Sequence, residues 1–326
     1  MDTLLRQDSV TKRRLLQCGA AGLAFAPMLA AAQNPPPPAD AQKIATVNDA
    51  AKRLTVTVSI NGQGPYNFVI DTGADRTVFA DDIAATLGLP HGGQVMVQGV
   101  VRTLPSQTVL VRDLSFGPVT KQYLHIPVLP RALLQADGYL GLDALDEHRV
   151  TFDFKNHLLE VGEKLSGGFG HYLHRDDAQS VIPVSGDFGH LRSADCNIAG
   201  VPAAAFIDTG AAVSVGNPEL FAALQGSNSG MAQSGTIPLT GVTGGTIDGH
   251  LALVDTIKLK DLNFSDCTLV IADLQIFDIW GLAKKPALMI GMNYLRQFAK
   301  VSIDYGSKEL RFDLARLDDS MIAMQG

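Results

Sequence analysis

The chain has 326 residues, of which 46% are hydrophobic and 18% charged, and its formal net charge is -7. This length is sufficient for two domains with separate cores, and the composition excludes an intrinsically disordered chain. The negative charge argues against a surface for nucleic acid or anionic lipid, so neither is expected as a partner.

Residues 1–32 have the pattern of an export signal. A basic run at residues 12–14 precedes an apolar, Ala-rich run at residues 18–32, which is too short to cross a bilayer and ends in three small residues suited to cleavage. The paired arginines resemble a twin-arginine signal, and an ordinary secretory signal is the alternative. We therefore expect an exported protein, periplasmic or secreted, without a transmembrane helix in its mature part.

The first of two similar units is expected at residues 43–164. A Pro-rich tether at residues 33–42 leads into it, because runs of proline are stiff and extended. Runs rich in β-branched and aromatic residues predict strands at 43–47, 54–60, 66–70 and 123–129, and hairpins with arms at 94–98 and 107–111 and across 150–161. A short helix is expected at residues 81–87, where Gly88 and Pro90 follow.

The same order of features recurs in a second unit, expected at residues 181–316. A stretch rich in Gly, His and charge predicts a linker at residues 165–180, and residues 317–326 form a tail. Strand patterns at 181–184 and 191–198, a Gly-Pro turn, a hairpin turn, an apolar segment ending in Gly and a final hairpin follow the order of the first unit. This recurrence predicts a duplicated, β-rich unit.

The strongest sign of duplication is a repeated tetrapeptide. Residues 71–74 and 208–211 both read Asp-Thr-Gly-Ala, and each ends an apolar run. A single Asp-Thr-Gly is expected by chance in about one chain of this length in fifteen to twenty, and alone it indicates no more than a strand-to-turn with a hydrogen-bonded aspartate. Two copies with the same apolar run and the same following alanine indicate a shared function.

Each unit resembles the retropepsin-like aspartic proteases. Besides the Asp-Thr-Gly-Ala loop, each has a hairpin of the flap type and an apolar-apolar-Gly segment before a short helix, ending in Gly141 and Gly291. Two such units in one chain are similar to the bilobal arrangement of pepsin-like enzymes, here of a bacterial, exported type. The resemblance covers nearly all of residues 43–316. It implies an all-β fold of two tandem acid-protease β-barrel units related by a pseudo-twofold axis, in a monomer with an internal pseudo-dimer.

The family resemblance also implies an aspartic endopeptidase with a peptide or protein as substrate. Asp71 and Asp208 would face each other across the axis and share a proton, because two adjacent carboxylates do not both ionise cheaply. The ionised carboxylate would activate water and the neutral one would protonate the leaving nitrogen, without assignment of either role to either residue. The residues expected to support the loops are Thr72, Gly73, Ala74, Thr209, Gly210, Ala211, Gly141 and Gly291. Of these, Gly73 and Gly210 are expected to allow the tight turn and the approach of substrate to the backbone. Those expected in the flaps are Gly99, Val100, Val101, Gly241, Val242, Gly244 and Gly245.

Two departures from the family pattern bear on activity. Ala74 and Ala211 stand where pepsin-like enzymes usually have a hydroxyl that lowers the pKa of the carboxylate, so we expect an optimum at mildly acidic or near-neutral pH. The second flap tip, at residues 241–245, is rich in glycine, whereas the first, at residues 99–105, is bulkier and stiffer. This difference argues against symmetric closure of the two flaps.

Several alternatives stay open at this point. A non-catalytic peptide-binding protein that retains the fold is the alternative function, and pairing of units between chains is the alternative arrangement. The chain has no zinc motif, nucleotide loop or serine-hydrolase elbow, so neither a metal nor a cofactor is expected. Cys196 and Cys267 would form either a disulfide or two buried thiols. Trp280 is expected in the core, with a binding edge as the alternative.

Overall fold

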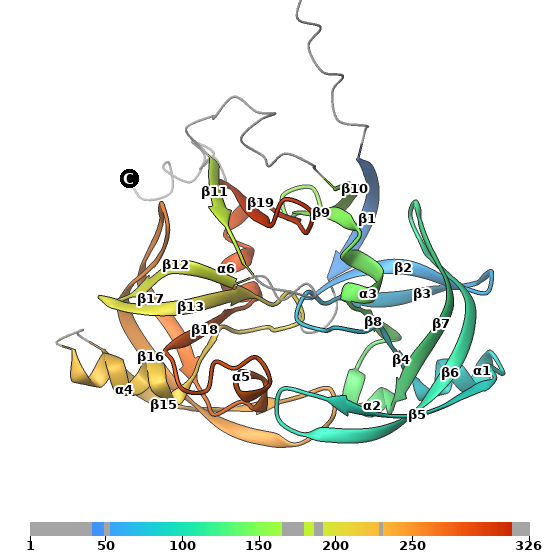
Figure 1. The fold of residues 1–326 in the computed structure, drawn as a ribbon, viewed down its shortest axis with the longest axis horizontal. Helices are drawn as coiled ribbons and strands as arrows, with labels where there is room; N and C mark the ends of the chain where they lie inside the picture. The colour runs from blue at the N-terminus through green and yellow to red at the C-terminus, as the bar shows by residue number, and fades with distance from the viewer. Residues whose placement is uncertain (1–40, 49–52, 165–178, 186–191, 228–230, 315–326) are drawn as a thin grey trace, which may run out of the picture. The chain divides into compact units, whose positions relative to one another are not determined.

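Twenty strands and six short helices make up the part of the chain that the structure describes (Figure 1). The computed structural model describes residues 41–48, 53–164, 179–185, 192–227 and 231–314. All of these lie within one compact unit, residues 38–326. The predicted signal peptide and tail, and most of the predicted tether and linker, lie outside the described residues. The prediction of an all-β fold is confirmed.

The elements of the first half are as follows. The strands are β1 (Gln42–Asn48), β2 (Leu54–Ile60), β3 (Gln63–Ile70), β4 (Val78–Ala80), β5 (His91–Gln98), β6 (Thr103–Phe116), β7 (Val119–Leu129), β8 (Gly138–Leu140), β9 (His148–Asp153) and β10 (Leu158–Glu163). The helices are α1 (Asp81–Thr86), α2 (Arg131–Leu134) and α3 (Leu142–Leu145).

The second half repeats this pattern. Its strands are β11 (Gln179–Pro183), β12 (Arg192–Ile198), β13 (Val201–Ile207), β14 (Val215–Gly216), β15 (Ala232–Thr240), β16 (Thr246–Leu259), β17 (Leu262–Ile271), β18 (Ala287–Ile290), β19 (Phe298–Asp304) and β20 (Glu309–Leu314). Its helices are α4 (Pro218–Gly226), α5 (Gln275–Ile279) and α6 (Met292–Leu295).

Both halves form a barrel with the same strand order. In the first unit the order is β2-β3-β8-β4-β7-β6, and β2 also pairs with β6. In the second unit the order is β12-β13-β18-β14-β17-β16, and β12 also pairs with β16. Since the closing pair joins equivalent strands in each case, the prediction of two tandem barrels is confirmed.

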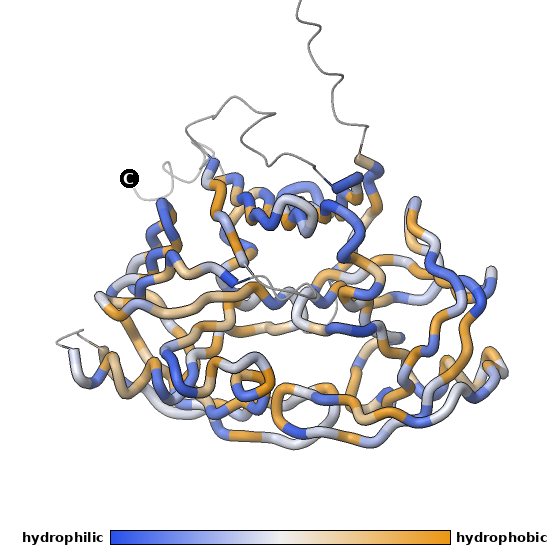
Figure 2. The backbone as a smooth tube through the Cα atoms, in the orientation of Figure 1, coloured by the Kyte–Doolittle hydropathy of each residue, from blue (hydrophilic) through white to orange (hydrophobic). Residues whose placement is uncertain are grey.

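Burial of alternate side chains explains why these segments form barrel strands. Apolar and polar residues alternate along many of the strands (Figure 2). In β2, Val56 and Val58 are almost completely buried whereas Thr57, between them, is exposed. Successive side chains of a strand point to opposite faces, so one face of the strand contributes to the apolar core of the barrel and the other faces outward.

A six-stranded sheet, β11-β20-β19-β9-β10-β1, joins the two units. Its central pair is β9 with β19, which are equivalent strands of the two repeats. In this antiparallel pair Thr151 lies opposite Ser302, its equivalent in the second unit, and the two hydroxyls are hydrogen-bonded at 2.8 Å. The pseudo-twofold axis therefore passes between these two residues.

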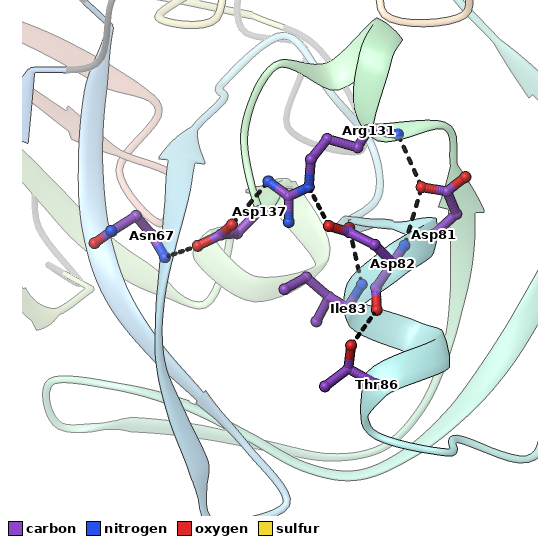
Figure 3. A network of polar contacts seen from close by, with 7 residues as sticks. All are labelled: Asn67, Asp81, Asp82, Ile83, Thr86, Arg131 and Asp137. Atoms are coloured by element: carbon purple, nitrogen blue, oxygen red, sulfur yellow. Dashed lines mark hydrogen bonds and ion pairs between the residues drawn. The ribbon is translucent and has the colours of Figure 1, made fainter.

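A network of polar contacts fixes the helices of the first barrel against β3, the strand that leads to Asp71 (Figure 3). The Arg131 guanidinium is ion-paired with Asp82 at the start of α1 and with Asp137 before β8. The Asp137 carboxylate in turn accepts the backbone N–H of Asn67 in β3 at 2.7 Å. Arg131 thus connects α1 and α2 to the strand that positions the functional loop.

The flap hairpin of the first unit is longer than predicted. Its second arm begins at Thr103 and not at residue 107, and its first arm already begins at His91. In β5 no side chain is buried, so this arm of the flap lacks the buried face from which strand boundaries are read in a sequence. Among the helices of the described residues, none has the length and hydropathy of a membrane span.

Candidate active site

The ends of two equivalent strands bring Asp71 and Asp208 together. Asp71 follows β3, and its backbone N–H donates to the carbonyl of Leu140 in β8 at 3.0 Å. Asp208 follows β13, and its N–H donates to the carbonyl of Ile290 in β18, also at 3.0 Å. The predicted position of the apolar-apolar-Gly segments beside the loops therefore matches the structure.

The two loops are joined by their threonines. The hydroxyl of Thr72 accepts the N–H of Thr209 at 3.1 Å, and the hydroxyl of Thr209 accepts the N–H of Thr72 at 3.1 Å. Each hydroxyl also donates across the axis, Thr72 to the carbonyl of Ile207 at 3.1 Å and Thr209 to that of Ile70 at 2.8 Å. Because both threonines are buried, these four bonds are shielded from water and hold the two aspartates in a fixed relative position.

Gly73 and Gly210 are required for a reason that differs from the expected one. Neither has a positive φ, so the turn itself does not demand glycine. A Cβ on Gly73 would lie 2.6 Å from Cγ of Asp208, and a Cβ on Gly210 would lie 2.6 Å from Cγ of Asp71. Each glycine therefore makes room for the carboxyl of the opposite unit, in addition to any approach of substrate that was predicted.

The carboxyls of Asp71 and Asp208 each lie against the loop glycine of the opposite unit and interact with each other. Burial and the neighbouring Asp208 raise the pKa of Asp71 well above its ordinary value, and burial raises the pKa of Asp208 as well. The backbone donors are unequal, since Asp71 accepts the N–H of Gly73 whereas Asp208 accepts those of Gly210 and Ala211 at 2.8 and 3.1 Å. Such donors stabilise the ionised form, so ionised Asp208 is better stabilised than ionised Asp71.

A second pair of polar contacts, which the sequence analysis missed, supports the loops from below. Thr77 donates to the Asp143 carboxylate at 2.8 Å and accepts the N–H of Gly141 at 3.2 Å. In the second unit Ser214 donates to the Asn293 side chain at 2.7 Å and accepts the N–H of Gly291. Alignment of the two repeats pairs these positions, and this was the signal by which they could have been found.

Gly141 and Gly291 are tightly packed against the loops. A Cβ on Gly141 would lie 2.4 Å from the backbone of Arg76, and one on Gly291 would lie 2.6 Å from the carbonyl of Val213. Such distances are far below van der Waals contact, so any larger residue would displace the loop that carries the aspartate. These two glycines therefore have the supporting position that was predicted for them.

A pocket of about 410 Å³ opens beside Asp71. Its walls come from both units, and most of the lining is apolar. The lining residues are Asp71, Gly73, Ala74, Asp75, Arg76, Val78, Val95, Met96, Val97, Gln98, Pro127, Tyr139, Val242, Ile276, Ile279 and Trp280. Of the predicted flap residues only Val242 is among them.

The sequence analysis therefore missed most of the pocket. Residues 95–98 lie in the first arm of the flap, whereas Ile276, Ile279 and Trp280 come from α5 and its end in the other unit. Trp280 is 9% exposed and packs edge-on against Phe206 at 4.1 Å between ring centroids. Both interpretations of Trp280 thus hold, since it packs in the core and lines the pocket.

The other predicted flap residues lie where the two flap tips meet. A Cβ on Gly241 would lie 3.0 Å from Val100, and one on Gly245 would lie 3.1 Å from Val101. Gly99 and Gly244 likewise contact the opposite tip. The difference in bulk between the tips therefore does not keep them apart, because glycines of each flap accommodate side chains of the other.

The last candidate residues are the two cysteines and possible metal ligands. Cys196 and Cys267 are both free and buried, and burial raises the pKa of the Cys196 thiol to about 12. They are therefore two buried thiols and not a disulfide. In the described residues, no group of three or more His, Cys, Asp or Glu side chains is arranged to hold a metal ion.

Comparison with known proteins identified one family. The model of the family described as Aspartyl protease matches residues 56–144 and, again, residues 194–294. Each matched region contains one Asp-Thr-Gly-Ala loop and most of one barrel. No curated protein matches the chain.

Proposed function

Because the two matched regions cover more than half of the chain, it belongs to the aspartyl protease family, and we propose that it is an endopeptidase whose catalytic residues are Asp71 and Asp208. The observation that carries this proposal is the close approach of the two carboxyls, each packed against the loop glycine of the opposite unit, beside a pocket that both units line. A non-catalytic binding protein would have no need of two adjacent carboxyls whose charges repel each other.

The unequal backbone donors support a division of roles. Ionised Asp208 accepts a proton from a water molecule, whose oxygen attacks the carbonyl carbon of the substrate. Neutral Asp71 donates its proton to the carbonyl oxygen as the tetrahedral intermediate forms. Collapse of the intermediate breaks the C–N bond while the proton taken up by Asp208 passes to the leaving nitrogen and one hydroxyl of the intermediate returns its proton to Asp71. The proton for nitrogen thus comes from the carboxyl that activated the water and not, as expected from the sequence, from the initially neutral one. Because the two groups share their protons, this assignment describes the dominant form of the pair.

The raised pKa values support the expected pH dependence. The reactive form has one proton on the pair, so activity falls on the acid side as Asp208 becomes protonated and on the alkaline side as Asp71 loses its proton. Because burial raises both pKa values, both limbs move upward, and we expect an optimum at mildly acidic or near-neutral pH. A pH–rate profile measures this, and a maximum near pH 2 to 3 (the range of an unperturbed or lowered carboxyl pKa) would contradict it.

The pocket supports a preference for apolar side chains in the substrate. Val78, Val97 and Ile276 are among its walls, and Trp280 closes one side. Burial of an apolar side chain in such a pocket stabilises the complex by roughly 1.5 to 3 kcal/mol. We therefore expect cleavage next to large apolar residues within extended segments of a peptide or an unfolded protein.

The decisive experiment compares three variants of the mature protein on a panel of unfolded proteins at about pH 4 to 7, a range that brackets the expected optimum. Asp71→Asn and Asp208→Asn should each abolish cleavage without loss of the fold. Asp261→Asn, at an exposed position in the turn between β16 and β17, is the matched control and should cleave as the unsubstituted protein does. Retention of cleavage in either of the first two variants would refute the proposed function. Tight peptide binding by an unsubstituted protein that never cleaves would support the alternative of a peptide-binding protein.

We also propose that the enzyme is exported and acts as a monomer. The pattern at residues 1–32 supports export, and the four threonine bonds within one chain support an internal pseudo-dimer. N-terminal sequencing of the protein from a periplasmic fraction should give a chain that begins near residue 33. Sedimentation of the active protein should give the mass of one chain, and an active dimer would instead favour pairing of units between chains.

A further inference from the structure

The tips of the two flaps are joined by a reciprocal pair of hydrogen bonds. The Arg102 side chain, in the turn between β5 and β6, donates through Nε to the carbonyl of Thr243 at 2.8 Å. The Thr243 hydroxyl, in the turn between β15 and β16, donates to the carbonyl of Arg102 at 2.7 Å. The two turns meet near the lower edge of the molecule in Figure 1.

The packing around this pair is close. Thr243 is completely buried, which is unusual for the tip of an exposed hairpin. A Cβ on Gly99 would lie 2.1 Å from the Thr243 hydroxyl, and a Cβ on Gly244 would lie 2.4 Å from the Arg102 guanidinium. Glycine is therefore needed at both positions to let the two tips interlock.

The first flap makes a further contact with the opposite unit next to its tip. Gln275, the first residue of α5, donates through its side-chain amide to the Thr103 hydroxyl at 2.9 Å. The same helix contributes Ile276 and Ile279 to the pocket. The tip of the first flap is thus connected to the second unit through two neighbouring residues, Arg102 and Thr103.

We propose that Arg102 and Thr243 form a latch that closes the flaps over the pocket and that must open for a peptide to reach Asp71. This inference rests on the proposed function. Val242, next to Thr243, lines the same pocket as Asp71, so the joined tips border the pocket that leads to this carboxyl. The bonds of the latch join protein to protein, so they stabilise the closed state with or without a peptide.

A latch of this kind has a distinct kinetic signature. Loss of the latch makes the open state more populated, so a peptide associates and dissociates faster by the same factor while its affinity stays nearly constant. A residue that binds the peptide directly would instead change the dissociation rate alone. Removal of one of the two hydrogen bonds is expected to raise both rates about fivefold.

The chain contains its own probe for this measurement. Trp280 is the only tryptophan, and it lines the pocket. Stopped-flow measurement of its fluorescence can follow the binding of a peptide in which a non-hydrolysable hydroxyethylene group replaces the scissile amide. Thr243→Val removes the hydroxyl and keeps the shape of the side chain, whereas Thr243→Ser retains the hydroxyl. Thr240→Val, which removes an exposed hydroxyl from the same flap outside the latch, is the control.

Thr243→Val should raise the association and dissociation rates about fivefold each, and Thr243→Ser and Thr240→Val should leave them unchanged. Arg102→Met removes the other bond from an exposed side chain, so it should fold normally and reproduce the effect of Thr243→Val. Unchanged rates in both Thr243→Val and Arg102→Met, or a change in dissociation alone, would overturn the latch and leave the protease proposal intact. If the peptide does not bind to the unsubstituted protein at all, the proposed function fails and the latch fails with it.

Discussion

Replacement of Thr72 by Val tests whether the threonine bonds hold the two units together. The Thr72 hydroxyl makes two short buried bonds across the axis, to the Ile207 carbonyl and from the Thr209 N–H, each 3.1 Å long, and has a longer contact of 3.4 Å with the Thr209 hydroxyl. Val has the same shape as Thr but cannot make either bond. Loss of the two bonds costs about 2 kcal/mol, and the buried N–H left without its acceptor adds about 1 kcal/mol. The expected loss in the free energy of unfolding is therefore about 3 kcal/mol.

Urea unfolding at neutral pH, with unchanged slope, measures this loss. Thr72→Ser is the matched control, because it keeps the hydroxyl and removes only a methyl group, with an expected loss of about 0.8 kcal/mol. The difference between the Val and Ser variants isolates the contribution of the hydroxyl. If the Val variant is as stable as the Ser variant, the four threonine bonds do not hold the units together and the reasoning is refuted.

Three further predictions concern charge and packing. Burial raises the pKa of Asp71 in the folded state, so protonated Asp71 contributes fully to stability below the ordinary carboxyl pKa, and this contribution is lost as the pH rises through the raised pKa. Asp71→Asn should therefore increase the free energy of unfolding near pH 8 but not near pH 3. A change that does not depend on pH would contradict this. The ion pair with Arg131 lowers the pKa of Asp82, so Arg131→Gln should reduce the free energy of unfolding at neutral pH by at most about 1 kcal/mol, because the pair is half-exposed. This reduction should shrink as the pH falls through the lowered pKa of Asp82. A reduction that persists in acid would exclude this ion pair as its source. Trp280→Ala should lower the free energy of unfolding by about 3 to 5 kcal/mol and shift cleavage toward substrates with bulkier side chains. An unchanged cleavage-site profile on a peptide library would show that Trp280 does not line the substrate site.

Whether a feature could be predicted from the sequence depends on whether it arises within one short segment of the chain. Each Asp-Thr-Gly-Ala loop is one continuous segment that directly follows a buried apolar run, so its position could be predicted from the sequence. The duplication could be predicted too, because the same short patterns occur in the same order in both halves of the sequence. A symmetric pair of barrels then brings Asp71 and Asp208 to the axis.

Why particular residues are required at their positions could be seen only from tertiary contacts. Gly73 was predicted as a turn residue, but it is required because the carboxyl of Asp208 lies where its Cβ would be. Thr77 and Asp143 were missed because each is an ordinary polar residue in its own segment. Only their packing beneath the loop gives them a supporting position.

The amino-acid sequence by itself determined the β-rich duplicated fold, the family and the two aspartates, because these follow from local periodicity and a contiguous motif. Only the tertiary structure decided the pocket, to which α5 of one unit contributes beside the flap of the other, and the joined flap tips. Arg102 and Thr243 are 141 positions apart, and the strands that lead into their turns, β5 and β15, have no buried side chains. No local pattern marks such residues, since their burial arises only when two distant hairpins meet.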